Sequence, residues 1–402
     1  MQSITLLIKP ASYHCNMSCG YCFYKRVRSV YPEKSCFMTL DTARELVRRT
    51  LALGCRESQF CWQGGEPSLL GLDFFREIVK FQAELAAPGQ IVINTFQTNG
   101  TLIDEAWAGF FARYRFLVGL SLDGPRHIHD RYRRFGSGKG TFDLVMKTAN
   151  LLKESGVRFN ILSLLTEAGV AEPVELYRFF REKGFSHLQF IPCVEWDPLT
   201  KESLPFSISG HALGKFYCNL FDTWLRDGFW NVSIRAFEDI LLYYIDHAHV
   251  SCTHSERCDS YLLVEHNGDV YPCDFFVYPE WKLGNIIADG YEKVLANRVR
   301  RGFALLKADL PEECKDCKWL DFCHGDCLKF RGNDLGRSGG SSVICEAHRM
   351  LLEHMSPHLE SIRQTALRFR RDGAGRKSPA GVGRNSPCPC GSGLKHKKCC
   401  GR

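Results

Sequence analysis

Six short apolar runs in the first half of the chain constrain its fold more than any other feature. Each is rich in β-branched, leucine or aromatic residues and has the length of a buried strand. The runs are ITLLIKP from Ile4, SQFCWQ from Ser58, IVINTFQ from Ile91, RFLVGLSL from Arg115, VRFNILSLL from Val157 and HLQFIP from His187. Helical patterns at residues 40–54, 71–85 and 141–156 lie between them. Strands that alternate with helices predict parallel βα units.

The segment that follows each run is polar and rich in glycine or cysteine. These segments read CNMSCGYC, GGEP, TNG, DGP, TEAG and CVEWDP. In a parallel βα barrel, the carboxyl ends of the strands form the side that carries active sites. Since a closed barrel has eight strands, we predict an α/β fold with a partial (β/α)6 TIM-like barrel and a site at this end. An ordinary doubly wound sheet is the alternative.

Cysteine usage favours metal ligation over disulfides. The chain has 402 residues, 20 of them cysteine. It lacks a run of about 18 apolar residues, and its N-terminus does not resemble a signal peptide. We therefore expect a cytoplasmic protein, whose thiols stay reduced and can bind metals.

Three cysteines follow the first predicted strand with the spacing C-x3-C-x2-C. Cys15, Cys19 and Cys22 can converge on three corners of a 4Fe–4S cubane, which leaves one iron without a protein ligand. A zinc site would need a fourth ligand, and the nearby His14 and Cys36 extend the pattern poorly. The spacing therefore favours a cluster with one open iron.

Together with GGEP after the second strand, these cysteines resemble the radical S-adenosylmethionine (SAM) superfamily. In that family the open iron chelates SAM, and the reduced cluster cleaves SAM to a 5′-deoxyadenosyl radical. The resemblance implies that Cys15, Cys19 and Cys22 ligate the cluster. It also implies that SAM is bound by Gly64, Gly65, Glu66, Pro67, Asn99, Ser121 and Arg133. Glycines would let main-chain carbonyls approach the SAM amino group, and Glu66 would supply charge.

A second group of eight cysteines lies between residues 252 and 345, a stretch that we call the Cys-rich segment. Eight thiols can form two four-ligand sites, and the residues alone allow two zinc ions or two clusters. The arrangement resembles the SPASM extension of radical SAM enzymes, which holds two auxiliary 4Fe–4S clusters. The resemblance implies that Cys252, Cys258, Cys273 and Cys327 ligate one cluster. It assigns Cys314, Cys317, Cys323 and Cys345 to the other.

Asp274 directly follows one of these cysteines. An isolated aspartate is more often a turn or helix cap, but this Cys-Asp pair resembles that of the anaerobic sulfatase-maturating enzymes. There the aspartate takes the proton from the target side chain. The resemblance, which spans roughly residues 3–357, also implies that Tyr24 and Gln63 lie near the target.

The resemblance to the maturating enzymes implies oxidation of a Cys or Ser of a sulfatase polypeptide to Cα-formylglycine. Clusters with four protein ligands have no open iron, so the auxiliary clusters are expected to carry electrons. A flavodoxin- or ferredoxin-type protein would be the low-potential electron donor. The rival functions are thioether or carbon–carbon crosslinking by another SPASM enzyme, and a non-catalytic iron–sulfur or zinc adaptor. Asp274, and the absence of an obvious leader-peptide-binding domain before Ile4, favour oxidation to Cα-formylglycine over crosslinking.

The chain ends in a basic tail with its own cysteine group. Residues 361–402 contain eleven Lys or Arg and one acidic residue, so the net charge of +7 arises here, and we do not expect nucleic-acid binding. The spacing C-x-C-x8-C-C resembles the SEC-C zinc motif, with the ligands Cys388, Cys390, Cys399 and Cys400. So short a segment cannot fold on apolar burial alone, so zinc is expected. Docking of ribosomes, chaperones or client chains is a hypothesis for its role.

We therefore divide the chain into four parts. These are a radical SAM barrel (1–235), a SPASM domain (236–360), a basic helix end and linker (361–386) and a SEC-C motif (387–402). Pro357 is expected to break the helical pattern that runs through the second boundary. The other cysteines are expected to be ordinary core or surface residues, namely Cys36, Cys55, Cys61, Cys193 and Cys218.

Overall fold

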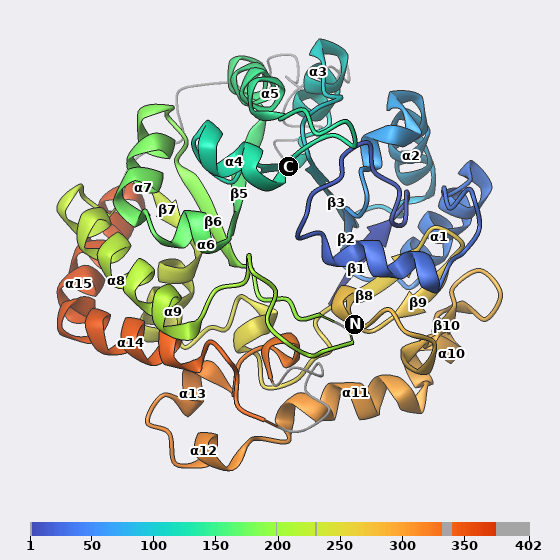
Figure 1. Cartoon of the computed structure of the whole chain (residues 1–402). Coiled ribbons are helices and arrows are strands. Elements are labelled where there is room, and N and C mark those ends of the chain that lie inside the picture. Colours follow the sequence, from blue (N-terminus) through green and yellow to red (C-terminus); the bar gives the residue numbers. More distant parts are fainter. Residues whose placement is uncertain (1, 198, 230, 332–339, 375–402) are drawn as a thin grey trace. The chain divides into compact units, whose positions relative to one another are not determined.

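A ten-stranded sheet with the order β10-β9-β8-β1-β2-β3-β4-β5-β6-β7 organises residues 1–354 (Figure 1). From β8 to β7 all neighbours are parallel, whereas β9 and β10 are antiparallel. The computed structural model describes residues 2–197, 199–229, 231–331 and 340–374. The strands are β1 (Ser3–Lys9), β2 (Glu57–Trp62), β3 (Ile91–Thr98), β4 (Leu117–Ser121), β5 (Arg158–Leu165), β6 (His187–Pro192), β7 (Ser233–Ile234), β8 (Leu262–Glu265), β9 (Asp269–Tyr271) and β10 (Gly284–Asn285). The six predicted strands and the open, partial barrel are confirmed.

The two faces of the barrel strands differ in chemistry. Side chains that point outward are apolar, as in the ring cluster of Phe75, Phe96, Trp107 and Phe111 between the sheet and its helices. Alternate residues point into the barrel and include amides such as Gln97 of β3. Because both faces are covered, the strands read as nearly continuous apolar runs in the sequence.

Helices cover the outer face of the barrel (Figure 1). Between β1 and β6 the sequence predicted α1, α2 and α5, and the structure adds the shorter helices α3, α4, α6 and α7, while α8 and α9 follow β6. Thr39 caps α1 by accepting a hydrogen bond from Thr42 N at 3.1 Å, as its position before the apolar pattern predicted. These helices are α1 (Leu40–Ala52), α2 (Leu72–Leu85), α3 (Glu105–Arg113), α4 (Arg126–Tyr132), α5 (Phe142–Glu154), α6 (Glu167–Val170), α7 (Pro173–Glu182), α8 (Gly210–Arg226) and α9 (Arg235–Asp246).

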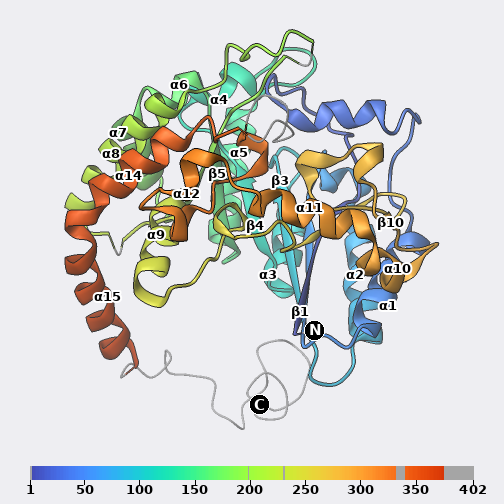
Figure 2. The ribbon, with the colours of Figure 1, turned by 90° about the horizontal axis from the view of Figure 1, so that it is seen from below.

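The Cys-rich segment extends the sheet of the barrel. Its strand β8 pairs in parallel with β1, where Lys9 stands opposite Glu265. Its helix α10 lies beside α1, and the hydroxyls of Tyr291 and Thr50 are 2.7 Å apart (Figure 2). The helices here are α10 (Gly290–Ala296), α11 (Arg298–Ala308), α12 (Glu312–Lys315), α13 (Leu320–Cys323) and α14 (Cys345–Met355).

Short 3-10 turns carry several of the predicted site residues. They are η1 (Phe23–Ser29), η2 (Pro67–Leu70), η3 (Cys252–His254), η4 (Asp274–Phe276), η5 (Pro279–Trp281) and η6 (Leu328–Phe330). Met355–Arg402 forms a second unit, with η7 (Ser356–His358) and α15 (Leu359–Ala374). The predicted helix break is confirmed, since Pro357 lies in η7. No helix of the described residues is long and apolar enough to cross a membrane.

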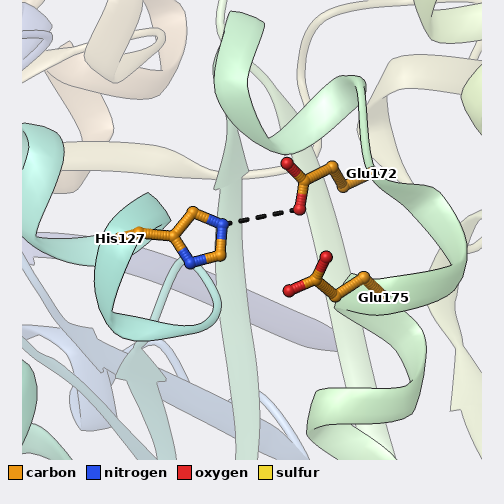
Figure 3. Close-up of side chains that lie close together, drawn as sticks. All are labelled: His127, Glu172 and Glu175. Atoms are coloured by element: carbon orange, nitrogen blue, oxygen red, sulfur yellow. Dashed lines mark ion pairs between the residues drawn. The ribbon is translucent and has the colours of Figure 1, made fainter.

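One exposed polar group joins α4 to the start of α7 (Figure 3). His127 Nε2 lies 3.4 Å from a carboxylate oxygen of Glu172, and Glu175 lies beside them. None of the three lines the cavities described below. We interpret this group as a surface ion pair, because exposed acidic residues gather in this way without binding a metal.

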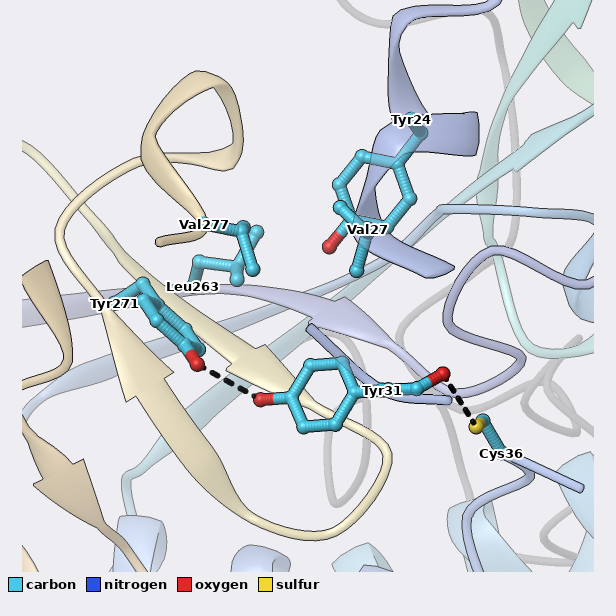
Figure 4. Packing of buried hydrophobic residues seen from close by; sticks show 7 residues of the cluster. All are labelled: Tyr24, Val27, Tyr31, Cys36, Leu263, Tyr271 and Val277. Carbon is cyan, nitrogen blue, oxygen red and sulfur yellow. Dashed lines mark hydrogen bonds between the residues drawn. The ribbon is translucent and has the colours of Figure 1, made fainter. Parts of the chain in front are cut away.

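An apolar cluster fixes the chain after the first cysteines against β8 and β9 (Figure 4). Its members come from η1, the segment behind it and the Cys-rich segment, and the hydroxyls of Tyr31 and Tyr271 are 3.0 Å apart. The cluster consists of Tyr24, Val27, Tyr31, Cys36, Leu263, Tyr271 and Val277. Cys36 is fully buried here, as are Cys55 and, almost entirely, Cys193, which confirms their expected place in the core.

We predict that Leu263→Ala lowers the stability of the protein by weakening this apolar cluster. Leu263 is fully buried, and such truncations cost about 2–5 kcal/mol of the free energy of unfolding. The midpoint of anaerobic urea unfolding, followed by circular dichroism, should move to lower urea. Leu305→Ala is the control, because Leu305 is 48% exposed on α11 and its loss should change stability by less than about 0.5 kcal/mol. Equal midpoints for the two variants would contradict the stabilising role of Leu263 in the cluster.

Candidate active site

The strands of the barrel and the Cys-rich segment enclose a cavity of about 520 Å³, which we call the central cavity. From the strands, Gln63, Gln97 and Gln189 line it with amide groups. From the Cys-rich segment, four cysteines reach the same cavity, namely Cys252, Cys258, Cys273 and Cys327. The structure thus gathers the first predicted auxiliary set next to Gln63.

A second, smaller cavity of about 70 Å³ gathers the other predicted set. It is lined by Cys314, Cys317, Cys323 and Cys345. Nearest-neighbour pairing along the chain would have grouped the thiols differently, whereas the fold groups them as the resemblance implies. Their role as ligands remains a prediction.

The state of these thiols fits metal ligands. Burial raises the pKa of Cys258 to about 11, and it raises the pKa of Cys273 and of Cys327 well above the usual range. Without a cation these groups would stay protonated, since a buried thiolate is costly. A bound metal reverses this preference, because thiols deprotonate when they bind it.

Zinc ions and clusters ask for different spacings of the sulfurs. Four thiolates on a single zinc ion stand about 3.8 Å apart, and thiolates on separate irons of a cluster stand farther apart. Within residues 2–331 and 340–374, leaving out positions 198 and 230, no three cysteine Sγ atoms lie within 4.8 Å of one another.

The loop that carries Cys15, Cys19 and Cys22 lies between β1 and η1. Main-chain hydrogen bonds fix it, including Ser18 N to Arg134 O at 2.7 Å. The Sγ of Cys15 accepts a hydrogen bond from Met17 N at 3.4 Å. Burial raises the pKa of the Cys15 thiol to about 12. This thiol would therefore also stay protonated without a cation and deprotonate on binding a metal.

GGEP passes directly beneath this loop. Gly64 and Gly65 have φ of +114° and +53°, and a Cβ on Gly65 would lie 2.0 Å from the carbonyl oxygen of His14. The two glycines are therefore required by conformation and by space. They leave the main chain of the motif free of side-chain cover.

Glu66 is held inside the protein. Its carboxylate is fully buried and accepts four hydrogen bonds. The donors are Ser68 N, Ser68 Oγ, Thr98 Oγ1 and Asn99 N. The carboxylate thus braces the motif, and its role toward SAM stays a prediction.

Two of the remaining predicted SAM residues, Asn99 and Arg133, lie beside the first cysteines, and the third, Ser121, lies beside Gln97. Asn99 Nδ2 lies 3.6 Å from Cys15 Sγ, and Ser121 Oγ accepts from Gln97 at 3.0 Å. Arg133 Nε lies 2.9 Å from Asp123, so this guanidinium has a fixed position beneath the loop. Asp123 and Lys9, discussed next, were not singled out from the sequence.

Asp274 of the Cys-rich segment lies against the end of β1. Its Oδ2 is 3.4 Å from Lys9 Nζ, and its Oδ1 accepts from the Tyr261 hydroxyl at 3.2 Å. Cys273 Sγ is 3.7 Å from the same oxygen. Lys9 is 2% exposed, so this is a buried charge pair beside a predicted cluster ligand.

Tyr24 completes the group. Its ring lies beneath the Lys9 ammonium, 4.3 Å from ring centroid to Nζ, and its hydroxyl donates to Glu265. Burial and the nearby Glu265 raise the pKa of Tyr24 well above 10, so its hydroxyl keeps its proton. Lys9 and Glu265 are each the last residue of an apolar strand, and a buried charge at the end of such a run was the signal that could have found them.

Family comparisons agree with this geometry. Residues 10–180 match the radical SAM superfamily, residues 252–318 match the SPASM iron-sulfur cluster-binding domain, and residues 384–402 match the SEC-C motif. The SEC-C match and its four predicted zinc ligands lie outside the residues that the structure describes.

Similar proteins cover nearly the whole chain. A cysteine-type anaerobic sulfatase-maturating enzyme of Clostridium perfringens is 38% identical over 90% of this chain and 99% of its own. A serine-type anaerobic sulfatase-maturating enzyme of Bacteroides thetaiotaomicron is 31% identical over 90% and 92%. The solved structure of native anSMEcpe with bound AdoMet has a TM-score of 0.85 at 36% identity, over 90% of this chain and 99% of that one. A second structure of that protein holds AdoMet and the Cp18Cys peptide.

We predict that Gly65→Ala lowers SAM affinity at least tenfold. The new Cβ would clash with the His14 carbonyl and displace the loop. Gly54→Ala is the matched control, because its φ of +67° is similar but no atom lies within 4 Å of the new Cβ. Equilibrium dialysis of SAM against the anaerobically reconstituted proteins measures both. Equal SAM affinities in the two variants would contradict the predicted role of the loop.

Proposed function

The chain belongs to the anaerobic sulfatase-maturating enzymes of the radical SAM superfamily, and we propose that it oxidises a Cys or Ser side chain of a sulfatase polypeptide to Cα-formylglycine. One observation carries the proposal for this chain. The buried carboxylate of Asp274 is held by Lys9 and by Tyr261 directly beside Cys273, and both Tyr261 and Cys273 line the central cavity.

The cofactors are SAM and three 4Fe–4S clusters, and the residues fit them. When bound, SAM and the cluster of the first three cysteines supply the radical that removes a hydrogen atom from the target Cβ, and an auxiliary cluster accepts the electron released next. We assign the first auxiliary cluster to the central cavity and the second to the smaller cavity. Gly64 and Gly65 would hold the SAM amino group through their carbonyls.

Asp274 would act as the general base. After loss of the Cβ hydrogen atom, the target thiol or hydroxyl gives its proton to an Asp274 oxygen, and one electron leaves. The carbon–heteroatom bond becomes double, so one hydrogen atom, one proton and one electron account for the oxidation. A serine thus gives the aldehyde directly, whereas the thioaldehyde from cysteine takes up water and releases hydrogen sulfide.

Lys9 and Tyr261 determine how Asp274 can do this. The ammonium and the phenol each bind a different carboxylate oxygen, so the orientation of the carboxylate is fixed. Tyr24 packs under Lys9 and keeps water from the pair.

The substrate is a peptide segment in this proposal. A cavity of about 520 Å³ falls in the range that accommodates a few residues, and Gln63 offers an amide to a peptide main chain. The peptide held by the solved relative supports the same class of substrate. A flavodoxin- or ferredoxin-type protein remains our proposal for the electron donor.

We predict that Asp274→Asn separates SAM cleavage from peptide oxidation. Asparagine keeps the shape but cannot accept the proton, and loss of a general base typically costs about 10²–10⁴ in rate. Reconstituted enzyme receives SAM, a low-potential reductant and a peptide with the Cys-x-Pro-x-Arg motif. Mass spectrometry should show 5′-deoxyadenosine from both proteins, but formylglycine from the wild type alone.

Asp73→Asn is the control, because Asp73 lies exposed on α2 and pairs only with Arg76 within the described residues. This variant should match the wild type. Formylglycine formed at the wild-type rate by Asp274→Asn would rule out the assigned base. A crosslinked peptide in place of the aldehyde would favour the rival SPASM chemistry.

For the tail, we propose a zinc ion on Cys388, Cys390, Cys399 and Cys400, in a SEC-C motif that begins near residue 387. The barrel (1–235), the SPASM part (236–360) and the linker (361–386) complete the proposed division. By function, the motif would serve docking and not catalysis, because a zinc ion with four thiolate ligands has no open position for a substrate.

We predict one zinc per chain, lost in the double variant Cys399→Ser, Cys400→Ser. Atomic emission of the full-length protein gives zinc and iron together. Zinc should fall to background, while iron content and oxidation of the short peptide stay at wild-type values. The control is Cys218→Ser, which replaces a half-buried cysteine outside every proposed site. Loss of iron in the double variant would contradict the zinc assignment.

A further inference from the structure

Three cations are buried in the described part of the Cys-rich segment, and one of them, Lys329, pairs with Glu195. The other two, Lys307 and Arg331, are 0% and 1% exposed. Within the described part of the chain, neither lies within ion-pair distance of a carboxylate, and both donate to main-chain carbonyls instead. A buried charge usually has a counter-charge, so the partner of these two cations has to be sought nearby.

Lys307 lies on α11 against the central cavity's cysteines. Its Nζ donates to the carbonyl oxygen of Cys252 at 2.9 Å and to that of Thr253 at 2.5 Å. The ammonium also interacts electrostatically with the thiols of Cys258 and Cys327. Three of the four proposed ligands of the first auxiliary cluster therefore surround this one cation.

Arg331 follows η6 and lies between the two cysteine sets. It interacts electrostatically with Cys314 and Cys323 of the smaller cavity and with Cys258 of the central cavity. Its guanidinium is fixed by three carbonyl acceptors, which belong to Gly325 (2.7 Å), His324 (2.8 Å) and Asp309 (3.1 Å). A Cβ at position 325 would lie 2.3 Å from Nη2, so the glycine makes room for the guanidinium.

The buried carboxylate in this region is already paired. Asp326 interacts with both cations, but its Oδ2 lies 3.2 Å from His348 Nε2 and accepts from the Ser342 hydroxyl at 2.6 Å. The charge of Asp326 is therefore balanced by His348. Lys307 and Arg331 remain without a carboxylate counter-charge among the described residues.

We infer that Lys307 and Arg331 are the internal counter-cations of the auxiliary clusters and raise their reduction potentials. A cluster with four thiolates is an anion and gains one more negative charge when it accepts an electron. A fixed cation in a medium of low dielectric stabilises the reduced form more than the oxidised form. Lys307 would thereby prepare the cluster beside Asp274 to take the substrate electron, and Arg331 would act on both clusters.

The test is a redox titration of the anaerobically reconstituted full-length enzyme, followed by electron paramagnetic resonance. Added SAM perturbs the signal of the cluster with the open iron and so identifies the two auxiliary signals. Lys307→Gln keeps donors for the two carbonyls but removes the charge, Lys307→Arg restores it, and Lys293→Gln is the exposed control on α10.

Lys307→Gln should make the reduction equilibrium of one auxiliary cluster at least tenfold less favourable, a shift of about 59 mV for one electron. Lys307→Arg and Lys293→Gln should keep the wild-type potentials, and Arg331→Gln should lower both auxiliary potentials. Unchanged potentials in Lys307→Gln, at wild-type iron content, would overturn the inference.

Iron content separates the remaining outcomes. If Lys307→Gln loses one cluster and Lys307→Arg keeps it, the charge is required at that cluster, which supports the inference. If both variants lose it, Lys307 serves the packing of the loop and the inference fails. The inference rests on the proposed auxiliary clusters. If the wild-type protein bound iron for one cluster only, the proposed auxiliary clusters would be wrong, and the inference would fail with them.

Discussion

The parallel pairing of β8 with β1 joins the Cys-rich segment to the barrel, and the site depends on this joint. It sets Glu265 opposite Lys9, the last residue of a strand whose following loop carries the first cysteines. The apolar cluster around Tyr31 then holds that loop against β8 and β9. In this way two segments about 250 residues apart in sequence form one sheet, and Asp274 comes to lie beside the end of β1.

Four buried charged groups in the Cys-rich segment determine the electrostatics near the central cavity. Asp274 is matched by Lys9, and Asp326 by His348, so each buried carboxylate has its own partner. Lys307 and Arg331 have carbonyl acceptors only among the described residues, and anionic clusters would balance them. Each charge is costly on its own in a low dielectric, so the positions of ligands, base and cations depend on one another.

Much of the fold and part of the site could be predicted from the sequence. Apolar runs gave all six barrel strands, and the spacing of the first cysteines with GGEP pointed to the site at their carboxyl ends. The sequence did not predict that Glu66 would use its carboxylate inside the protein, because two of its four donors, on Thr98 and Asn99, come from a segment more than thirty residues further along the chain. Lys9 was missed for a similar reason, since its partner lies 265 residues away.

The sequence by itself determined the local features: strand and helix periods, the cap at Thr39, the glycines of GGEP and the presence of three cysteine groups. These depend on contacts between near neighbours in the chain, which residue type and spacing specify. Only the tertiary structure decided which four of the eight cysteines share a cavity, and where Asp274, Lys307 and Arg331 lie relative to them. Those distances depend on how β8 pairs with β1, a contact between distant segments that no local pattern encodes.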